Sequence, residues 1–350
     1  MCMISVIVPC YNEEAALPYF YDAFKKTAAE MEETFELIFV DDGSRDGTLR
    51  IAKELAAKDE IVRWISFSRN FGKEAAILAG LRAAKGDFVC LMDADLQDPP
   101  SLLPEMYRAV TLEGYDSAAT RRVTRKGEPP IRSFFARRFY RLMNRISDTD
   151  LVDGARDFRL MNRAFVDALL SLDETNRFSK GLFGWVGFRT KWIEFENVPR
   201  VAGETKWSFW GLLSYAIEGI IAFSTKPLVI ATICGLFCCL AALGGVAFVV
   251  ARYFLSGDPV QGWASLICVI LFLGGIQLLC IGVLGQYLAK TYLETKHRPL
   301  YIIQSANTPI GGGVRALARR RAYRAFLTYI FDCILPKIFV RSALGVSFPS

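Results

Sequence analysis

The chain has 350 residues, a formal net charge of +6 and 52% hydrophobic residues, enough for one large domain or two smaller ones. Its single histidine, His297, excludes Ser-His and Cys-His catalysis and any metal site built from several histidines. Its nine cysteines form no paired C-x-x-C framework, which argues against a disulfide scaffold or a structural zinc site. Any chemistry therefore depends on carboxylates, a metal ion and cationic side chains.

The N-terminal part of the chain alternates short apolar runs with segments of helical periodicity. We expect strands at residues 4–8, 35–40, 62–67, 88–92 and 117–120, and helices at 15–32, 48–58 and 73–84. Such alternation predicts an α/β domain with a mostly parallel sheet and helices on both faces. Ligands of such sheets bind outside the carboxyl ends of the strands.

Polar motifs follow four of the expected strands, at the ends where a ligand would bind. They are Pro9-Cys10-Tyr11-Asn12-Glu13, Asp41-Asp42-Gly43-Ser44, Ser68-Arg69-Asn70 and Asp93-Ala94-Asp95. In extended backbone Asp93 and Asp95 point to one side, and two such carboxylates suit a divalent cation that also binds a substrate phosphate. An Asp-x-Asp pair alone is common in solvated turns, but the other motifs favour the metal site.

Two known nucleotide-binding signatures are missing from this part of the chain. The first strand is not followed by G-x-G-x-x-G, and no G-x-x-x-x-G-K-[ST] occurs. A dinucleotide-binding fold and a P-loop enzyme are therefore both disfavoured.

Two long apolar segments, residues 228–250 and 263–289, contain no charged residue. Each is long enough to cross a bilayer as a helix, the alternative being a buried helical hairpin of a soluble protein. Lys226 precedes the first segment and Lys290, Lys296, His297 and Arg298 follow the second, whereas the intervening loop 256–262 contains no cation. The positive-inside rule then places both termini and the N-terminal domain in the cytoplasm.

Two further segments are expected to lie on the membrane surface. Residues 131–146 interleave arginines with aromatic side chains, and residues 207–224 form an amphipathic pattern before the first span. Basic and aromatic residues together also occur in nucleic-acid interfaces, but beside membrane spans an interfacial helix that meets lipid phosphates is the better interpretation.

Taken in order, the motifs of this chain resemble family 2 glycosyltransferases of GT-A fold. The resemblance is greatest to the polyprenyl-phosphate group, which includes dolichyl-phosphate mannose synthases and bacterial bactoprenol glucosyltransferases. It runs from Ser5 to about Ile303, and its carriers are the segments 8–14, 40–44, 67–74, 93–99, 157–161, 203–207 and 272–277. The stretch after Gly311 departs from the family pattern, and we assign it no role.

The resemblance implies a membrane-bound, inverting enzyme that moves a hexose, expected to be glucose from UDP-glucose, onto polyprenyl phosphate of the undecaprenyl type. Asp157 would be the catalytic carboxylate, and Asp93, Asp95 and Gln97 would hold Mg²⁺ or Mn²⁺. The donor would contact Pro9, Tyr11, Glu13, Asp41, Asp42, Arg121 and Lys206. Turn chemistry also explains Asp41, and a solvated loop also explains Arg121. We further expect Arg156, Arg159 and the segment 131–146 to gather the acceptor phosphate.

The implied division is a GT-A domain at 1–200, an interfacial helix at 201–227, two transmembrane helices at 228–290 and a cytoplasmic tail at 291–350, in a bacterial inner membrane and serving the cell envelope. Other donor sugars (N-acetylglucosamine, aminoarabinose or mannose) stay open, as do homo-oligomers and a non-catalytic nucleotide-sugar-binding or lipid-flipping subunit. Nucleic acid is not an expected partner. A processive polysaccharide synthase is disfavoured because its Gln-x-x-Arg-Trp motif is missing. The uncharged spans offer little basis for a transport path.

Overall fold

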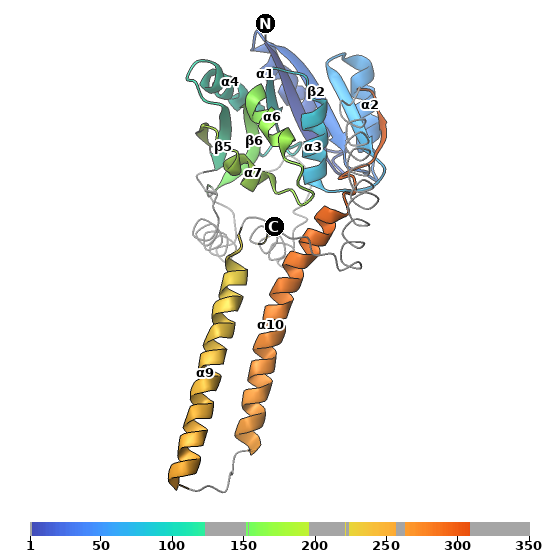
Figure 1. The fold of residues 1–350 in the computed structure, drawn as a ribbon. Helices are drawn as coiled ribbons and strands as arrows, with labels where there is room; N and C mark the ends of the chain where they lie inside the picture. Colours follow the sequence, from blue (N-terminus) through green and yellow to red (C-terminus); the bar gives the residue numbers. More distant parts are fainter. Residues whose placement is uncertain are drawn as a thin grey trace, which may run out of the picture.

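The structure, a computed structural model, describes residues 2–122, 152, 154–195, 221, 224–256 and 263–308. The segment 131–146, most of 207–224, Lys206 and the chain after Gly311 lie outside these ranges. An α/β domain stands at one end of the molecule, and two long helices extend from it (Figure 1).

The domain is built on one eight-stranded sheet with the order β7-β5-β6-β4-β1-β2-β3-β8. Its strands are β1 (Met3–Cys10), β2 (Thr34–Asp41), β3 (Val62–Phe67), β4 (Phe88–Leu91), β5 (Ser117–Arg122), β6 (Ala155–Asn162), β7 (Thr190–Phe195) and β8 (Ile303–Ala306). The central strands β4, β1, β2 and β3 are all parallel. Strand β6 is antiparallel to both of its neighbours, and β8 is antiparallel to β3. The prediction of a mostly parallel α/β sheet is confirmed.

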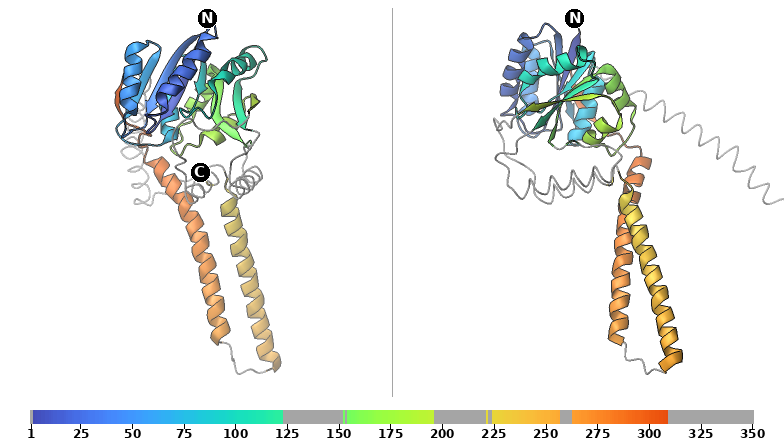
Figure 2. Two further views of the ribbon diagram at one scale, coloured as in Figure 1. Left: turned by 180° about the vertical axis from the view of Figure 1, so that it is seen from behind. Right: turned by 90° about the vertical axis from the view of Figure 1, so that its left-hand side faces the viewer.

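Helices cover both faces of the sheet (Figure 2). Helices α1 (Leu17–Ala29), α2 (Thr48–Lys58) and α4 (Leu103–Thr111), the last preceded by the 3-10 turn η1 (Pro100–Leu102), pack on one face. Helices α3 (Lys73–Ala83), α6 (Arg163–Ser171) and α7 (Ser179–Trp185) pack on the other. The strands alternate accordingly, with Val6 in the first core and Ile7 in the second. Helix α3 lies so close to β1 that a Cβ at Gly80 would be 2.2 Å from Ile7 Cγ2.

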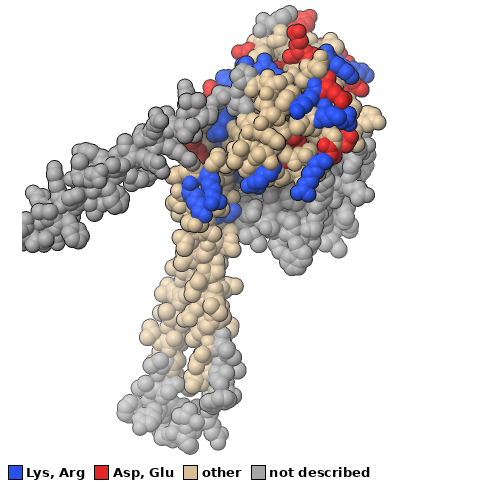
Figure 3. All heavy atoms as spheres, turned by 90° about the vertical axis from the view of Figure 1, so that its right-hand side faces the viewer, with Lys and Arg blue, Asp and Glu red and all other residues tan. Residues whose placement is uncertain are grey.

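The two apolar segments form α9 (Lys226–Ser256) and α10 (Trp263–Thr295), which run next to each other away from the domain (Figures 1 and 2). Their large apolar side chains are exposed, as in Phe237 at 71% and Leu278 at 72%, so the two helices are not buried against the rest of the described chain. Figure 3 shows an uncharged surface along the spans and basic side chains where α10 meets the domain. Two long exposed apolar helices suit membrane anchoring.

The chain after α10 returns to the sheet. Residues Ile303–Ala306 pair with the edge strand β3 as β8, and the ring of Tyr301 stacks on Phe67 at 5.0 Å between centroids. Part of the predicted tail 291–350 therefore contributes a strand to the domain.

Candidate active site

The carboxyl ends of β1, β2, β3 and β4 lie at one edge of the domain. Figure 1 shows the chain beginning at the end of the domain far from the spans, so β1 and the strands parallel to it run toward the spans. The loops after these strands therefore gather at the end of the domain from which α9 and α10 extend. This edge contains most of the residues that the sequence assigned to the site.

Asp41 and Asp42, at the end of β2, are both almost fully buried. Asp41 accepts hydrogen bonds from the Ser44 amide at 3.0 Å and the Ser66 hydroxyl at 2.8 Å. Asp42 accepts from the amides of Phe71 at 2.6 Å and Gly72 at 2.9 Å. Burial raises the pKa of Asp42, and these two N–H groups partly oppose the rise. Both carboxylates tie β2 to its neighbours, so turn chemistry accounts for part of their role.

The loop after β1 is held against the loop after β2. The Asn12 amide donates to Ser44 Oγ at 3.0 Å, and the Glu13 amide donates to Thr48 Oγ1 at 2.9 Å. Asn12 has a left-handed backbone with φ 54°. Gly43 does too, and a Cβ there would lie 2.4 Å from the Arg69 carbonyl carbon, so only glycine fits. The partly exposed side chains of Pro9, Tyr11 and Glu13 belong to this double loop.

The loop after β4 contains Asp93, Asp95 and Gln97, which the sequence assigned to a metal. Asp95 Oδ1 accepts the Gln97 amide at 3.1 Å. Leu96 between them has φ 56°, a left-handed conformation that costs a residue with a large side chain about 1–3 kcal/mol. Because such a conformation is unfavourable for leucine, the surrounding contacts must hold the backbone of this loop in place.

A buried ion pair supports this loop from below. Asp98 is fully buried and accepts Arg156 Nε at 3.0 and 3.2 Å, while Arg156 Nη2 donates to Gln97 Oε1 at 3.3 Å. Burial raises the pKa of Asp98 to about 6, with Arg156 opposing the rise. Arg156 therefore binds Asp98 and Gln97 in the loop after β4, and does not point toward an acceptor phosphate as expected from the sequence.

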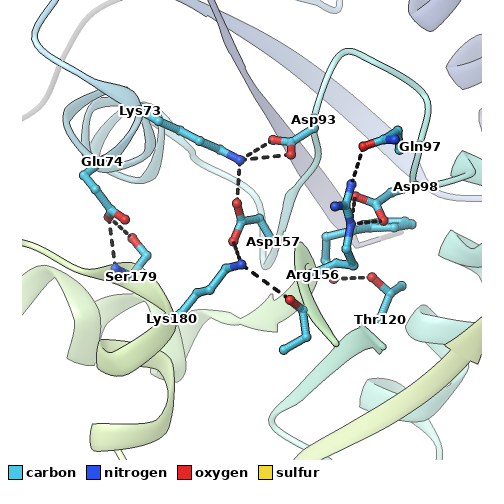
Figure 4. Close-up of polar contacts among 12 residues, drawn as sticks. Lys73, Glu74, Asp93, Gln97, Asp98, Thr120, Arg156, Asp157, Ser179 and Lys180 are labelled. Atoms are coloured by element: carbon cyan, nitrogen blue, oxygen red, sulfur yellow. Dashed lines mark hydrogen bonds and ion pairs between the residues drawn. The ribbon is translucent and has the colours of Figure 1, made fainter. Parts of the chain in front are cut away.

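Asp157 reaches the same edge because β6 runs antiparallel to β4. Arg159 lies opposite Leu91, the last residue of β4, so the two preceding residues of β6 extend past the end of that strand. Asp157 Oδ2 is 2.5 Å from Lys73 Nζ, and its Oδ1 is 3.9 Å from Lys180 Nζ (Figure 4). Burial alone would raise the pKa of Asp157, but Lys73 and then Lys180 hold that pKa well below its usual range.

Lys73 also contacts the first metal carboxylate. Its Nζ lies 2.7 Å from Asp93 Oδ1 and 2.9 Å from Oδ2, so one ammonium joins Asp93 to Asp157 (Figure 4). The next residue, Glu74, accepts hydrogen bonds from the Ser179 amide at 3.0 Å and from the Ser179 hydroxyl, which ties α3 to α7. Neither Lys73 nor Lys180 was expected at the site, although Lys73 lies within the motif at 67–74 that carries the family resemblance.

The expectation that Arg159 helps to bind the acceptor phosphate is wrong. Arg159 is buried, donates to Ser117 Oγ at 3.0 Å and Thr190 Oγ1 at 3.2 Å, and lies 4.6 Å from the Phe183 ring centroid. Its burial lowers its pKa to about 9. Because it points into the layer between the sheet and α7, it has no access to an acceptor.

Arg121 lies opposite Ala155 at the end of β5, near the start of β6, and its guanidinium is 3.8 Å from Glu194. Its Nε is buried and has no hydrogen-bond partner within the described part of the chain. Lys206 lies outside the described residues.

The donor chemistry of the β4 loop fits a divalent cation. Asp93 and Asp95 offer hard carboxylate oxygens and Gln97 an amide oxygen, and Asp93 already holds a cationic group. Within the described ranges there is no cluster of three or more His, Cys, Asp or Glu side chains that could enclose a metal. Two carboxylates and one amide oxygen would leave further coordination positions of a divalent cation to water or to a substrate phosphate.

Comparison with known proteins agrees with this arrangement. Residues 5–170 match the model of glycosyl transferase family 2. The chain is 44% identical over 307 residues to the putative glycosyltransferase CsbB of Bacillus subtilis (strain 168), a match that covers 88% of this chain and 93% of that protein. The chain belongs to glycosyltransferase family 2. The predicted family and enzyme class are confirmed.

This family 2 glycosyltransferase is also similar to the following two proteins. The bactoprenol glucosyl transferase of Shigella phage SfV is 42% identical over 306 residues, covering 86% of this chain and 98% of that protein. Among solved structures, glucosyl-3-phosphoglycerate synthase from Mycobacterium tuberculosis, in complex with Mn²⁺, UDP-glucose and phosphoglyceric acid, matches with a TM-score of 0.42 and 22% identity, covering 63% of this chain and 78% of that chain.

Proposed function

We propose that this glycosyltransferase moves glucose from UDP-glucose onto polyprenyl phosphate of the undecaprenyl (bactoprenol) type at a membrane surface. The observation that carries the proposal is the position of Asp93, Asp95 and Asp157 at the edge of the sheet that faces the two spans. A lipid phosphate lies at the bilayer surface, so an enzyme acting on it needs its site at that end. The relatives named bactoprenol glucosyl transferases match this chain along almost their whole length, which supports glucose and bactoprenol phosphate as substrates.

The donor is proposed to bind across the loops after β1, β2 and β4. Pro9, Tyr11, Glu13 and Asp42, with Asp41 beneath them, would line the nucleoside pocket. Asp93, Asp95 and Gln97 would hold Mg²⁺ or Mn²⁺, which when bound supplies positive charge to the diphosphate leaving group. Arg121 and Lys206 would add positive charge near the donor or acceptor phosphates.

Asp157 is proposed to position the acceptor. A phosphate monoester has a second pKa near ~6, so the acceptor oxygen is already mostly ionised at neutral pH and needs no strong base. Asp157 in turn is kept ionised by Lys73 and Lys180. The carboxylate would fix the positions of the two lysines beside the acceptor phosphate. The acceptor oxygen would then lie in line with the anomeric carbon, for direct displacement with inversion.

The cytoplasm is the proposed compartment of the catalytic domain, in a bacterial inner membrane. Basic residues lie at the domain ends of the spans, including Lys226, Lys290 and Lys296. Nucleotide-sugars are made in the cytoplasm, so this orientation gives the site access to its donor.

The decisive experiment mixes the full-length enzyme in detergent with undecaprenyl phosphate, Mg²⁺ and UDP-glucose, and measures both UDP and glycolipid. We expect stoichiometric release of UDP and formation of glucosyl lipid. Asp93→Asn or Asp95→Asn should lower the rate by about 10²–10³-fold, because each removes charge that balances the leaving diphosphate. A chelator should do the same to the wild type until Mg²⁺ or Mn²⁺ is restored.

Parallel reactions with UDP-N-acetylglucosamine, a nucleotide-linked aminoarabinose and GDP-mannose test the donor. Faster transfer of one of these sugars would replace glucose in the proposal. If UDP-glucose bound without UDP release or lipid product, the protein would be a binding subunit and the proposal would be wrong.

A further inference from the structure

The ammonium of Lys73 has a second contact, with Asp93, that its proposed role beside Asp157 does not explain. It lies between Asp93 and Asp157, in contact with both oxygens of Asp93 at 2.7 and 2.9 Å and with Asp157 Oδ2 at 2.5 Å (Figure 4). Asp93 is a proposed metal ligand, so a resident side chain holds the position at which a divalent cation would bind.

Both carboxylates of the loop after β4 are engaged. Asp93 contacts the ammonium of Lys73, and the contacts of Asp95 include the backbone N–H of Gln97. A second lysine, Lys180, approaches Asp157 at 3.9 Å from the other side and donates to the Ala155 carbonyl at 3.5 Å. Lys73 is thus the lysine that joins the proposed metal site to the proposed catalytic carboxylate.

The residues on both sides of Lys73 are tied to the rest of the domain, whereas its side chain is long and partly exposed. The preceding residue, Gly72, donates its amide to Asp42, and the following residue, Glu74, is bound by Ser179. The Lys73 side chain itself is 43% exposed and carries its charge on a flexible four-carbon stem. The ammonium can therefore leave one carboxylate without any change in the position of α3.

We infer that Lys73 is an exchangeable counter-ion that occupies Asp93 in the empty enzyme and gives up Asp93, but not Asp157, when a divalent cation binds with the donor. The inference rests on the proposed function and adds to it a positioning residue. In the empty enzyme the ammonium neutralises carboxylates that would otherwise repel one another. In the loaded enzyme, contact with Asp157 alone holds that carboxylate toward the acceptor.

Metal affinity distinguishes this role from a purely structural one. If Lys73 competes with the cation for Asp93, its removal should strengthen metal binding even though it weakens turnover. Full-length Lys73→Met enzyme in detergent, titrated with Mn²⁺ without nucleotide and followed by electron paramagnetic resonance, should bind Mn²⁺ about tenfold more tightly than the wild type. Lys73→Arg, which keeps the charge, should stay close to the wild type.

Lys180→Met is the matched control. It removes the same charge from the other side of Asp157 but does not touch Asp93, so its Mn²⁺ affinity should change less than about threefold. The inference is overturned if Lys73→Met binds Mn²⁺ no more tightly than the wild type, if both methionine variants tighten binding equally, or if no protein binds Mn²⁺. Lys73→Gln, checked for an unchanged melting temperature, replaces the methionine variant should that one misfold. Absence of lipid glucosylation by the wild type would refute the proposed function while leaving this affinity ratio measurable.

Discussion

Three carboxylates that follow strands β2 and β4 or lie at the start of β6 each have a different kind of partner. Asp157 faces two lysines, Asp98 is buried against one arginine, and Asp42 accepts two backbone N–H groups. The consequences for protonation differ as well, since the pKa of Asp157 is lowered while that of Asp98 is raised. Burial dominates the pKa of Asp98 in spite of its arginine, whereas two lysines outweigh burial at Asp157, so the same residue type titrates differently at this edge.

Asp157→Asn should separate catalysis from donor binding. The variant keeps the shape of the side chain but loses the charge that holds Lys73 and Lys180, so the acceptor oxygen is no longer kept in line with the anomeric carbon. Such positional effects are worth several kcal/mol, and we expect kcat to fall by about 10²-fold or more. The affinity for UDP-glucose, measured by calorimetry, should stay within about threefold of the wild type. Loss of donor binding with a normal kcat would instead assign Asp157 to the donor site.

Asp98 predicts a pH effect on stability. Its pKa in the folded state is about 6, above that of an ordinary aspartate, so its protonated form favours folding. That contribution is fully present below about pH 4 and is lost as the pH rises through 6, to a total of about 3 kcal/mol. Asp98→Asn cannot titrate, so relative to the wild type it should gain stability between pH 4 and 6.5. Thermal unfolding of both proteins in detergent measures this difference, and parallel curves across the range would contradict the assignment.

Some of these residues could be predicted from sequence and others could not. Asp93 and Asp95 follow an apolar run, and the structure places them at the carboxyl edge as expected. The contact between Lys73 and Asp157 could not be predicted, because the two residues are 84 positions apart. It depends on β6 pairing antiparallel with β4. Arg159 was assigned to a phosphate because it is a cation close to Asp157. Only the packing of α7 shows that it is buried.

At the level of elements, the end of α10 is bound to the catalytic domain through one short loop. Glu294 accepts the amides of Thr175 and Asn176 at 2.9 and 3.0 Å, and Lys290 Nζ donates to Asn176 Oδ1 at 2.9 Å. This loop leads directly into α7, whose first residues are Ser179 and Lys180. The span thus contacts the segment that positions a lysine of the site.

Glu294→Gln should weaken this contact between α10 and the loop that precedes α7. Hydrogen bonds from backbone amides to a carboxylate contribute roughly 1.5–3 kcal/mol, and an amide oxygen replaces them only in part. We expect a lower melting temperature and a lower kcat, with donor affinity unchanged, because the donor loops lie on other elements. Glu174→Gln is the control, since it neutralises a carboxylate of the same loop whose pKa is raised by burial and by the neighbouring Glu294, so the melting temperature should stay unchanged or rise slightly. Equal effects of the two variants would show that charge alone, and not this contact, is responsible.

The elements differ in how far local pattern determines them. Strands β1 to β5 and helices α1 to α3 were expected within a few residues, because each has a clear apolar period and a polar end. Strand β8 was not expected. It has four residues, follows a membrane span, and pairs with β3, about 240 positions earlier in the chain. Its stability comes from that edge and from the stacking of Tyr301 on Phe67, neither of which leaves a signal in the local sequence.

For the whole molecule, the direction of the strands and the position of the spans act together. The parallel strands run toward α9 and α10, so their carboxyl ends lie at the end of the domain from which these two helices extend (Figure 1). The spans expose large apolar side chains such as Leu240 and Leu279, which require a lipid environment. After the second span the chain returns to the domain as β8, which pairs with β3. The end of α10 is therefore tied to the edge of the sheet.

This arrangement predicts the orientation of the protein in the membrane. Lys290, Lys296 and Arg298 stand at the domain end of α10, whereas the loop 256–262 between the spans contains no cation, so the domain is expected in the cytoplasm. Asp258→Cys and Arg315→Cys, each placed in an active cysteine-free background, test the two sides with a membrane-impermeant maleimide. In intact cells position 258 should label and position 315 should not, and after permeabilisation both should label. The opposite pattern in intact cells would invert the orientation, and labelling at both positions would contradict a two-span anchor.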